Sequence, residues 1–313
     1  MQPSLEQSLV WVDRNGNPQP FAFSSLKAYS TPRISKDRIA VAIHPAGSIN
    51  FGSRDIWKLD LLRGTDIPLT SNGLSYWEVW SPDGKRLVYS SSVSGIPNLF
   101  VMNDNGTGQQ RLTTSPNVQA PSSWTENGNL VAFVEAPAGS LNWKIWVLPM
   151  DGDRKPKLFY ETQSALYYPT FSPDGHYIAY GSMEAAGQPA VYVQPYPGPG
   201  ERLRISPGIG SEPIWSADGH ELFYRERQRE GQKFFAVTIL STNPIRTEAP
   251  RRLFEAKPRE YEFSTPLRLW DVDRDGQHFL LIRTEESKEK PVTQIHAVLN
   301  WTEELKHQSP LTH

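Results

Sequence analysis

Apolar and polar residues alternate along most of this chain. A period of two is typical of strands that bury one face. The alternation is clearest at 55–61 (DIWKLDL), 144–150 (KIWVLPM) and 190–196 (AVYVQPY). A helical period is sustained only at 300–307 (NWTEELKH). The pattern therefore predicts an all-β protein.

A short turn phrase recurs between the alternating segments. It stands as WSPDG at 80–84, WTENG at 124–128, FSPDG at 171–175 and WSADG at 215–219, with degenerate copies around Asp37 and Asp275. Proline fixes φ at the second position of a type I turn, and glycine takes the left-handed conformation that follows it. Each phrase therefore predicts a tight hairpin that joins the first two strands of a repeat.

The spacing of the phrases indicates a ring of repeats. Successive copies lie 44 to 47 residues apart, except that 57 residues separate the last two. A four-stranded propeller blade has a period of about 40 to 45 residues. We predict one domain over residues 1–313, a six-bladed β-propeller of four-stranded antiparallel blades. The expected blades are 29–70, 76–114, 120–161, 167–206, 211–255, and 266–301 completed by 8–23.

Closure of the ring needs a separate account, because open sheet edges invite aggregation. Residues 9–23 have the pattern of a third and a fourth strand with no first two strands before them. The last repeat offers strands at 268–272, 277–283 and 294–301. We expect the N-terminal segment to supply the missing outer strand of the last blade. One strand is then left over. It either forms a fifth strand of that blade or belongs to a seventh, incomplete blade.

Composition narrows the classes of partner. The formal net charge is −2, which argues against a nucleic-acid partner, since such proteins usually carry a basic face. The chain has no cysteine, which excludes disulfides and thiolate chemistry. The first residues lack the basic and apolar regions of a signal peptide, and no apolar run is long enough for a membrane helix. We expect no membrane insertion, and the compartment stays open.

The turn phrase and the strands after it resemble the PD40 (WD40-like) repeat of TolB-like propellers. Segments 98–108 (NLFVMNDNGTG) and 145–153 (IWVLPMDGD) are especially similar to propellers attached to bacterial Ser/Thr kinases. The first copy, SKD at 35–37, departs from the repeat because it lacks both proline and glycine. The resemblance implies an extracytoplasmic, periplasmic sensor or interaction domain with a protein, peptide or carbohydrate ligand.

Fold analogy places candidate binding residues on one face. If the strands of a blade are named A to D from the centre outward, the D–A and B–C loops share the face with the channel mouth, the usual binding surface. The predicted binding residues there are Tyr29, His44, Arg54, Trp77, Trp143, Tyr167, Tyr168, Glu212 and Arg268. The tryptophans and tyrosines after Tyr29 break the repeat register and could stack on a sugar or grip a partner side chain.

Catalytic and metal motifs are weak in this sequence. Asp271, Asp273 and Asp275 spell the opening of a calcium loop, but Ile282 stands where that loop requires glutamate. Calcium is therefore a weak candidate, and we expect no cofactor. The chain has no G-x-S-x-G nucleophile elbow. We favour a non-catalytic binding module, and the alternative is a polysaccharide lyase or hydrolase at the channel mouth.

Overall fold

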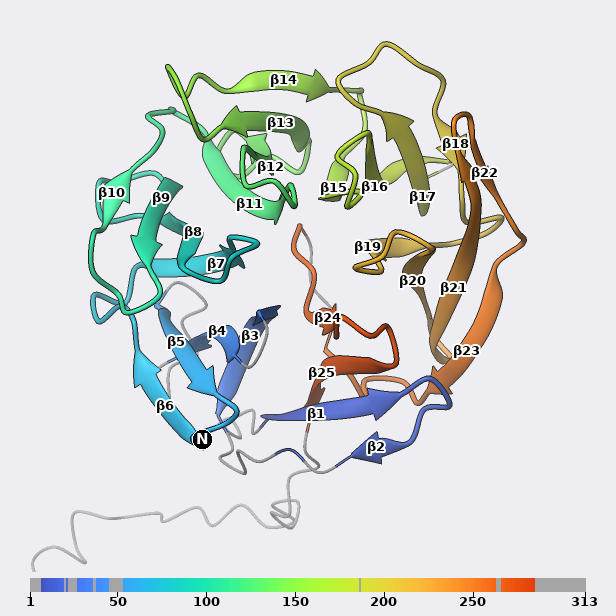
Figure 1. The fold of residues 1–313 in the computed structure, drawn as a ribbon, viewed down its shortest axis with the longest axis horizontal. Helices are drawn as coiled ribbons and strands as arrows, with labels where there is room; N and C mark the ends of the chain where they lie inside the picture. Colours follow the sequence, from blue (N-terminus) through green and yellow to red (C-terminus); the bar gives the residue numbers. More distant parts are fainter. Residues whose placement is uncertain are drawn as a thin grey trace, which may run out of the picture.

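The computed structural model describes residues 7–19, 21, 27–35, 38–44, 53–185, 187–262 and 266–284. These residues form six antiparallel sheets around a central axis, with the first strand of each blade innermost (Figure 1). The prediction of a six-bladed β-propeller is confirmed. The described residues contain no helix, and so none that is long and apolar enough to span a membrane.

Four blades follow the chain in simple order from the centre to the rim. Blade one contains β3 (Ala28–Ser35), β4 (Arg38–His44), β5 (Asp55–Asp60) and β6 (Thr65–Pro68). Blade two contains β7 (Ser75–Trp80), β8 (Arg86–Ser91), β9 (Asn98–Asn103) and β10 (Gln110–Arg111). Blade three contains β11 (Val118–Trp124), β12 (Leu130–Ala136), β13 (Lys144–Pro149) and β14 (Lys157–Tyr160). Blade four contains β15 (Leu166–Phe171), β16 (Tyr177–Ala185), β17 (Gln188–Pro195) and β18 (Leu203–Arg204).

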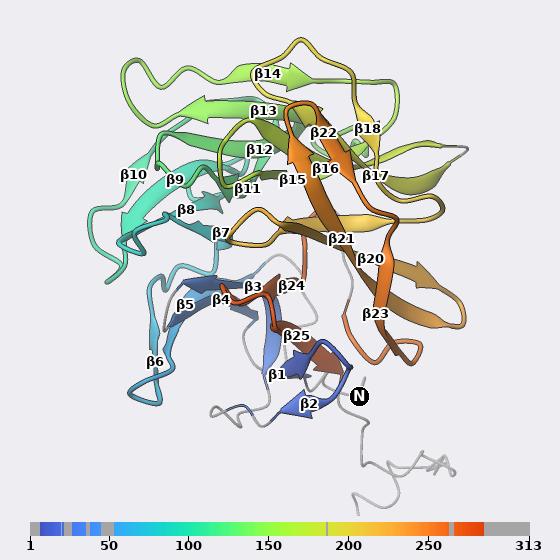
Figure 2. The same ribbon diagram turned by 45° about the vertical axis from the view of Figure 1, so that its right-hand side comes forward.

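Blade five has one strand more than the repeat predicts. It contains β19 (Ser211–Trp215), β20 (Glu221–Gln228), β21 (Gly231–Thr242), β22 (Ile245–Thr247) and β23 (Arg251–Ala256). The long β21 pairs with β23 along its first half and with β22 along its second (Figure 2). The added strand and the long loop after β23 explain why the last two turn phrases are so far apart.

The N-terminal segment closes the ring in blade six. This blade contains β24 (Trp270–Val272), β25 (His278–Thr284), β1 (Gln7–Asp13) and β2 (Pro18–Gln19). β1 pairs antiparallel with β25 from Gln7 opposite Thr284 to Asp13 opposite His278. The N-terminus thus supplies both outer strands. Residues 294–301, predicted as the third strand, lie outside the described residues, and β1 holds that position.

The turn phrases have the predicted geometry and also join the blades. In the second blade, the Ser81 hydroxyl donates to Asp83 at 2.6 Å, and Gly84 has φ of 70°. Two of the tryptophans that open a phrase reach back to the preceding blade. Trp80 Nε1 donates to the Arg33 carbonyl at 3.1 Å. Trp215 Nε1 donates in the same way to the Thr170 carbonyl. The core therefore lies between blades, where these rings pack.

Candidate functional site

The centre of the ring is filled by the chain itself. In Figure 1 the segment that leads into β24 runs into the middle of the ring. All four of its described residues, 266–269, are buried. Leu267 belongs to one apolar cluster with Tyr167 and Tyr168 of β15, although they lie in different blades. Leu267 therefore packs against the innermost strand of the fourth blade.

The innermost strands share a β-bulge that sequence analysis did not reveal. Four residues take positive φ at the same place in their blades: Thr31, Trp77, Tyr168 and Glu212, at 49°, 63°, 56° and 54°. The pairing register of β3, β7, β15 and β19 shifts at these residues. Such φ values are uncommon outside glycine, and bulges redirect side chains at barrel rims and active sites. The bulge therefore sets which side chains meet at the ring centre.

A buried ion pair anchors the fifth blade to the central segment. Glu212 and Arg225 are both fully buried and form a salt bridge. The Leu269 amide donates to the other oxygen of Glu212 at 3.1 Å, and Arg225 Nη1 donates to the Gln232 side chain at 3.1 Å. Burial raises the pKa of the Glu212 carboxyl, while the guanidinium of Arg225 acts in the opposite direction. These contacts give the pair a structural role.

A second buried network joins the sixth blade to the first. Arg268 Nη2 donates to Asp271 at 3.1 Å, and the other oxygen of Asp271 accepts from the Ile34 amide at 2.8 Å. Arg33 Nη1 donates to the Arg268 carbonyl at 3.0 Å. Burial, together with the charge of Arg268, lowers the pKa of Arg33 to about 10. Arg268 and Asp271 are therefore tied to the closure of the ring.

Glu78 is a buried acid that no sequence motif identified. Its side chain is fully buried, and among the described residues it forms no ion pair. The Thr31 hydroxyl donates to its two oxygens at 3.4 and 3.3 Å. Burial raises the pKa of Glu78 to about 7, although Arg33 and Arg54 act against this from further away. The carboxyl therefore titrates near neutral pH.

The four aromatic residues that break the repeat register lie close together, and three of them are buried in packing contacts. Trp143, Tyr167 and Tyr168 belong to one buried cluster, and Trp77 packs against it. Trp143 and Tyr167 are each 8% exposed, and Tyr168 is 1% exposed. Trp77 is half-buried and meets Tyr76 edge to face with ring centroids 4.7 Å apart. Of the four predicted aromatic residues, Trp77 offers the most accessible ring.

The other predicted residues are more widely distributed. Tyr29 is buried in a different cluster, with Leu9, Leu269 and Leu280. Arg54 lies over the Tyr76 ring, 5.8 Å from its centroid, and burial lowers the pKa of Arg54. The side chain of His44 lies outside the described part of the chain. A role in binding stays a prediction for all of these residues.

An exposed apolar patch stands on the predicted binding face. We define the loop-face patch as Leu74, in the loop before β7, with Val93 and Ile96 in the loop between β8 and β9. Val93 is 53% exposed. The Ser92 amide donates to the Leu74 carbonyl at 3.0 Å, so the two loops adjoin. Leu141, in the corresponding loop of the third blade, is 75% exposed. Sequence periodicity missed these residues because they lie between strands.

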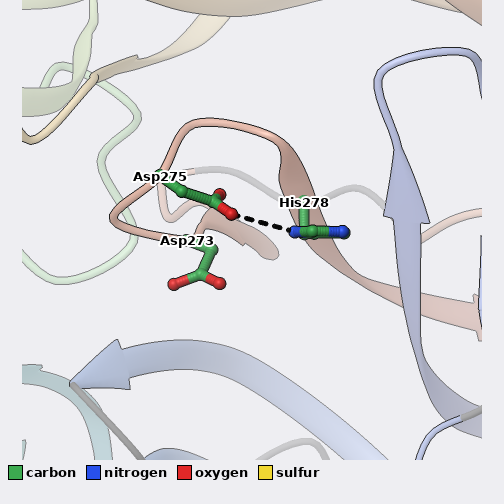
Figure 3. Close-up of side chains that lie close together, drawn as sticks. All are labelled: Asp273, Asp275 and His278. Carbon is green, nitrogen blue, oxygen red and sulfur yellow. Dashed lines mark ion pairs between the residues drawn. The ribbon is translucent and has the colours of Figure 1, made fainter.

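The three aspartates predicted as calcium ligands lie in two different surroundings in the structure. Asp271 points into the buried network, whereas Asp273 and Asp275 lie in the β24–β25 turn, close to His278 at the start of β25 (Figure 3). His278 Nδ1 lies 3.3 Å from an oxygen of Asp275. Calcium takes about six to eight oxygen ligands. Two carboxylates and one imidazole are a poor fit to calcium, so the ion stays a weak prediction.

Comparison with known proteins supports the fold strongly. The structure of a putative TolB from Agrobacterium tumefaciens matches 91% of this chain and all of its own, with a TM-score of 0.69 and 15% identity. TolB from Acinetobacter baumannii matches 81% of this chain and 66% of its own, with a TM-score of 0.59 and 21% identity. Among curated proteins, TolB of Anaeromyxobacter is 25% identical over 116 residues. The chain has the β-propeller fold of these TolB structures.

Other similar proteins add little about the activity of this chain. An uncharacterized protein of Agrobacterium fabrum is 28% identical over 61% of this chain and 67% of its own length. An oligogalacturonate lyase from Vibrio parahaemolyticus has a TM-score of 0.56 at 11% identity, over 88% of this chain and 77% of its own, a likeness of fold alone. No protein-family profile matches the sequence. The match to Anaeromyxobacter TolB covers 37% of this chain and 26% of that protein's length.

Proposed function

We propose that this β-propeller is a binding module that docks a protein partner on the loop face of its second and third blades. The loop-face patch carries the proposal. Scattered exposed apolar residues are common, but a contiguous group is a feature of interaction surfaces. Leu74, Val93 and Ile96 are contributed by two adjoining loops, and the half-buried rings of Tyr76 and Trp77 follow Leu74 after one intervening serine.

The chemistry of the patch favours a protein over a carbohydrate. Sugars are held by exposed aromatic faces together with polar groups, whereas Leu74, Val93 and Ile96 are aliphatic. The predicted stacking platform is largely closed, since Trp143 and Tyr167 are buried. Aliphatic side chains beside Tyr76 and Trp77 instead suit the apolar side chains of a partner.

The alternative, a polysaccharide lyase or hydrolase at the channel mouth, has less support. It needs Glu212, Arg268, Arg54 and His44 to converge on a substrate. Glu212 and Arg268 are buried and engaged with Arg225 and Asp271. Arg54 lies against Tyr76. The likeness to oligogalacturonate lyase concerns the fold, so it does not transfer an activity to this chain.

The name of one curated relative also agrees with a protein as the partner. That protein is named as a component of the Tol-Pal system, and it matches this chain over 116 residues. The resemblance to TolB-like propellers further leads us to propose an extracytoplasmic location. A sensor role beside a kinase domain stays a prediction from the repeat motifs alone.

Quantitative affinity capture tests the proposal. The bait variant is Val93→Ser with Ile96→Ser, and the control is Leu158→Ser with Leu240→Ser, two exposed residues of β14 and β21. Burial of two aliphatic side chains is worth about 3 kcal/mol, so the patch variant should lose about a hundredfold in affinity for its specific partner. The control should bind normally.

Two outcomes would contradict the proposal. Equal retention of the specific partner by the patch variant and the wild type would exclude this docking surface. Cleavage of a polysaccharide by the pure protein, abolished in Arg54→Met, would favour the enzymatic alternative.

A further inference from the structure

A small basic pocket lies on the loop face of the fifth blade. Its volume is about 220 Å³. It is lined by Arg227, Gln228, Arg229, Gln232, Pro258 and Arg259. These residues come from the end of β20, the turn that follows it, the start of β21 and the loop after β23. In both ribbon views, the turn and the end of β23 lie at the same end of the blade (Figures 1 and 2).

Local pairing holds the two walls of the pocket together. β20 and β21 remain paired up to Gln228 opposite Gly231, so Arg229 stands at the tip of a regular hairpin. β21 in turn pairs with β23, with Gln232 opposite Ala256. A Cβ at Gly231 would lie 2.4 Å from the Ala256 carbonyl oxygen, which shows how closely the hairpin approaches β23. The walls are therefore part of the sheet.

The second wall is a strained turn. Arg259 has φ of 61°, which is uncommon for a residue other than glycine. The turn is held because the Glu260 amide donates to the Lys257 carbonyl at 3.2 Å and the Lys257 amide donates to the Glu260 carboxylate at 2.9 Å. Strain of this kind concentrates at functional sites. Here it sets the position of one guanidinium that lines the pocket.

The lining carries three guanidinium groups and no carboxylate. Of the acids in the same segments, Glu226 accepts from the Gln228 side chain, and Glu260 accepts from a backbone amide. Glu230 follows Arg229 at the exposed tip of the hairpin and does not line the pocket. Two arginines of β23 form ion pairs, Arg251 with Glu221 and Arg252 with Glu255. Within the described part of the chain, no ion pair engages Arg229 or Arg259. The residues that line the pocket thus carry a net positive charge.

Gln232 gives the pocket a fixed floor. Its side chain is 2% exposed, and both ends of the amide are engaged. The oxygen accepts from Arg225 Nη1 at 3.1 Å, and the nitrogen donates to the Tyr261 carbonyl at 2.5 Å. The floor is therefore held by the same buried network that contains Glu212. A rigid floor under charged walls is a preorganised arrangement for a ligand.

We propose that this pocket binds the carboxylates of an acidic peptide segment. The inference rests on the proposed function, because it gives the protein partner a second point of contact. The guanidinium fork matches a carboxylate in two parallel hydrogen bonds. A volume of about 220 Å³ is below the range of about 300 to 1,000 Å³ for drug-sized ligands, so it suits one or two acidic side chains. Phosphate shares this chemistry and is separated by the test.

Fluorescence anisotropy with labelled hexaglutamate tests the inference, with hexaglutamine as the neutral probe. The pocket variant is Arg229→Gln with Arg259→Gln. The control, Arg63→Gln with Arg246→Gln, removes the same charge from two exposed positions elsewhere. We expect hexaglutamate to bind the wild type and the control alike, at least about tenfold more weakly to the pocket variant, and less tightly as salt rises. Hexaglutamine should not bind.

The inference is overturned if both variants weaken binding equally, because that result reports net charge alone. It is also overturned if hexaglutamate fails to bind at low salt. Millimolar inorganic phosphate that displaces the peptide and stabilises only proteins with an intact pocket would assign the site to phosphate instead. The loop-face patch variant, Val93→Ser with Ile96→Ser, should still bind hexaglutamate. If the partner is captured through that patch but hexaglutamate does not bind, this inference alone fails.

Discussion

Replacing Glu78 by glutamine should make the protein less sensitive to rising pH. The Glu78 carboxyl has a pKa of about 7 in the fold, against an ordinary value of 4.5. Below the ordinary value both the folded and the unfolded states bind the proton, so Glu78 imposes no penalty. Between the two values only the folded state binds it, and each increase in pH favours unfolding. Above about 7 the penalty is complete.

The size of the penalty follows from the burial of the group. A difference between 4.5 and about 7 corresponds to about 3 kcal/mol, at about 1.4 kcal/mol for each pH unit. Glutamine has nearly the same shape and no charge, so Glu78→Gln should remove the penalty. In acid, the unfolding free energies of the variant and the wild type should differ only by a constant offset. Above neutral pH, the variant should gain about 3 kcal/mol of unfolding free energy relative to the wild type. The constant offset contains any difference in hydrogen bonding with Thr31.

Urea unfolding at a series of pH values measures the effect. The quantity to compare is the difference in unfolding free energy between Glu78→Gln and the wild type, from about pH 4.5 to about pH 8.5. Glu201→Gln, at an exposed position, is the matched control and should show no pH-dependent difference. A flat difference for Glu78→Gln would refute the reasoning. A loss of stability that grows with pH would show instead that the folded state stabilises the carboxylate through Arg33.

Three further outcomes are expected. Arg225→Met should cost about 3 to 5 kcal/mol because it leaves the buried Glu212 carboxylate without its partner, whereas the double variant with Glu212→Gln should recover much of that loss in urea unfolding. Val12→Ala, in the closing strand, should lower the unfolding free energy by about 2 kcal/mol; an unchanged value would mean that β1 contributes nothing to closure. Calcium at millimolar concentration should leave the melting temperature unchanged, and a rise that Asp275→Asn abolishes would contradict this.

The fold could be predicted because its determinants are local and repeated. Each turn phrase carries its own φ preferences, and each following strand alternates, so the blades could be counted without any long-range information. The sequence did not decide which strand pairs with β25 to close the ring. β1 and residues 294–301 have similar patterns, and alternation does not say which of two strands pairs with β25. The extra strand β22 was not predicted either, because its three residues are too few to show the alternation of a strand.

The candidate site was only partly predictable, because it depends on long-range contacts. The sequence identified Trp77, Trp143, Tyr167 and Tyr168 as a group, and the structure brings them together. Their burial depends on the segment before β24, which enters the ring centre from another blade. The acidity of Glu78 likewise depends on burial beneath Thr31, about one repeat away in the chain. Neither effect is encoded within a single repeat.

Because β1 completes the last blade, its pairing with β25 can form only after the strands of all the other described blades have been made. The pairing of Gln7 with Thr284 spans almost the whole described chain. Loop-closure entropy for so distant a contact must be paid before the contact contributes, which slows folding. Until then β1 keeps an unpaired edge that another molecule could occupy. A circular permutant that begins at β3 and returns to β1 after β25 would turn this late, long-range step into a local hairpin, and it should fold faster with the same ring.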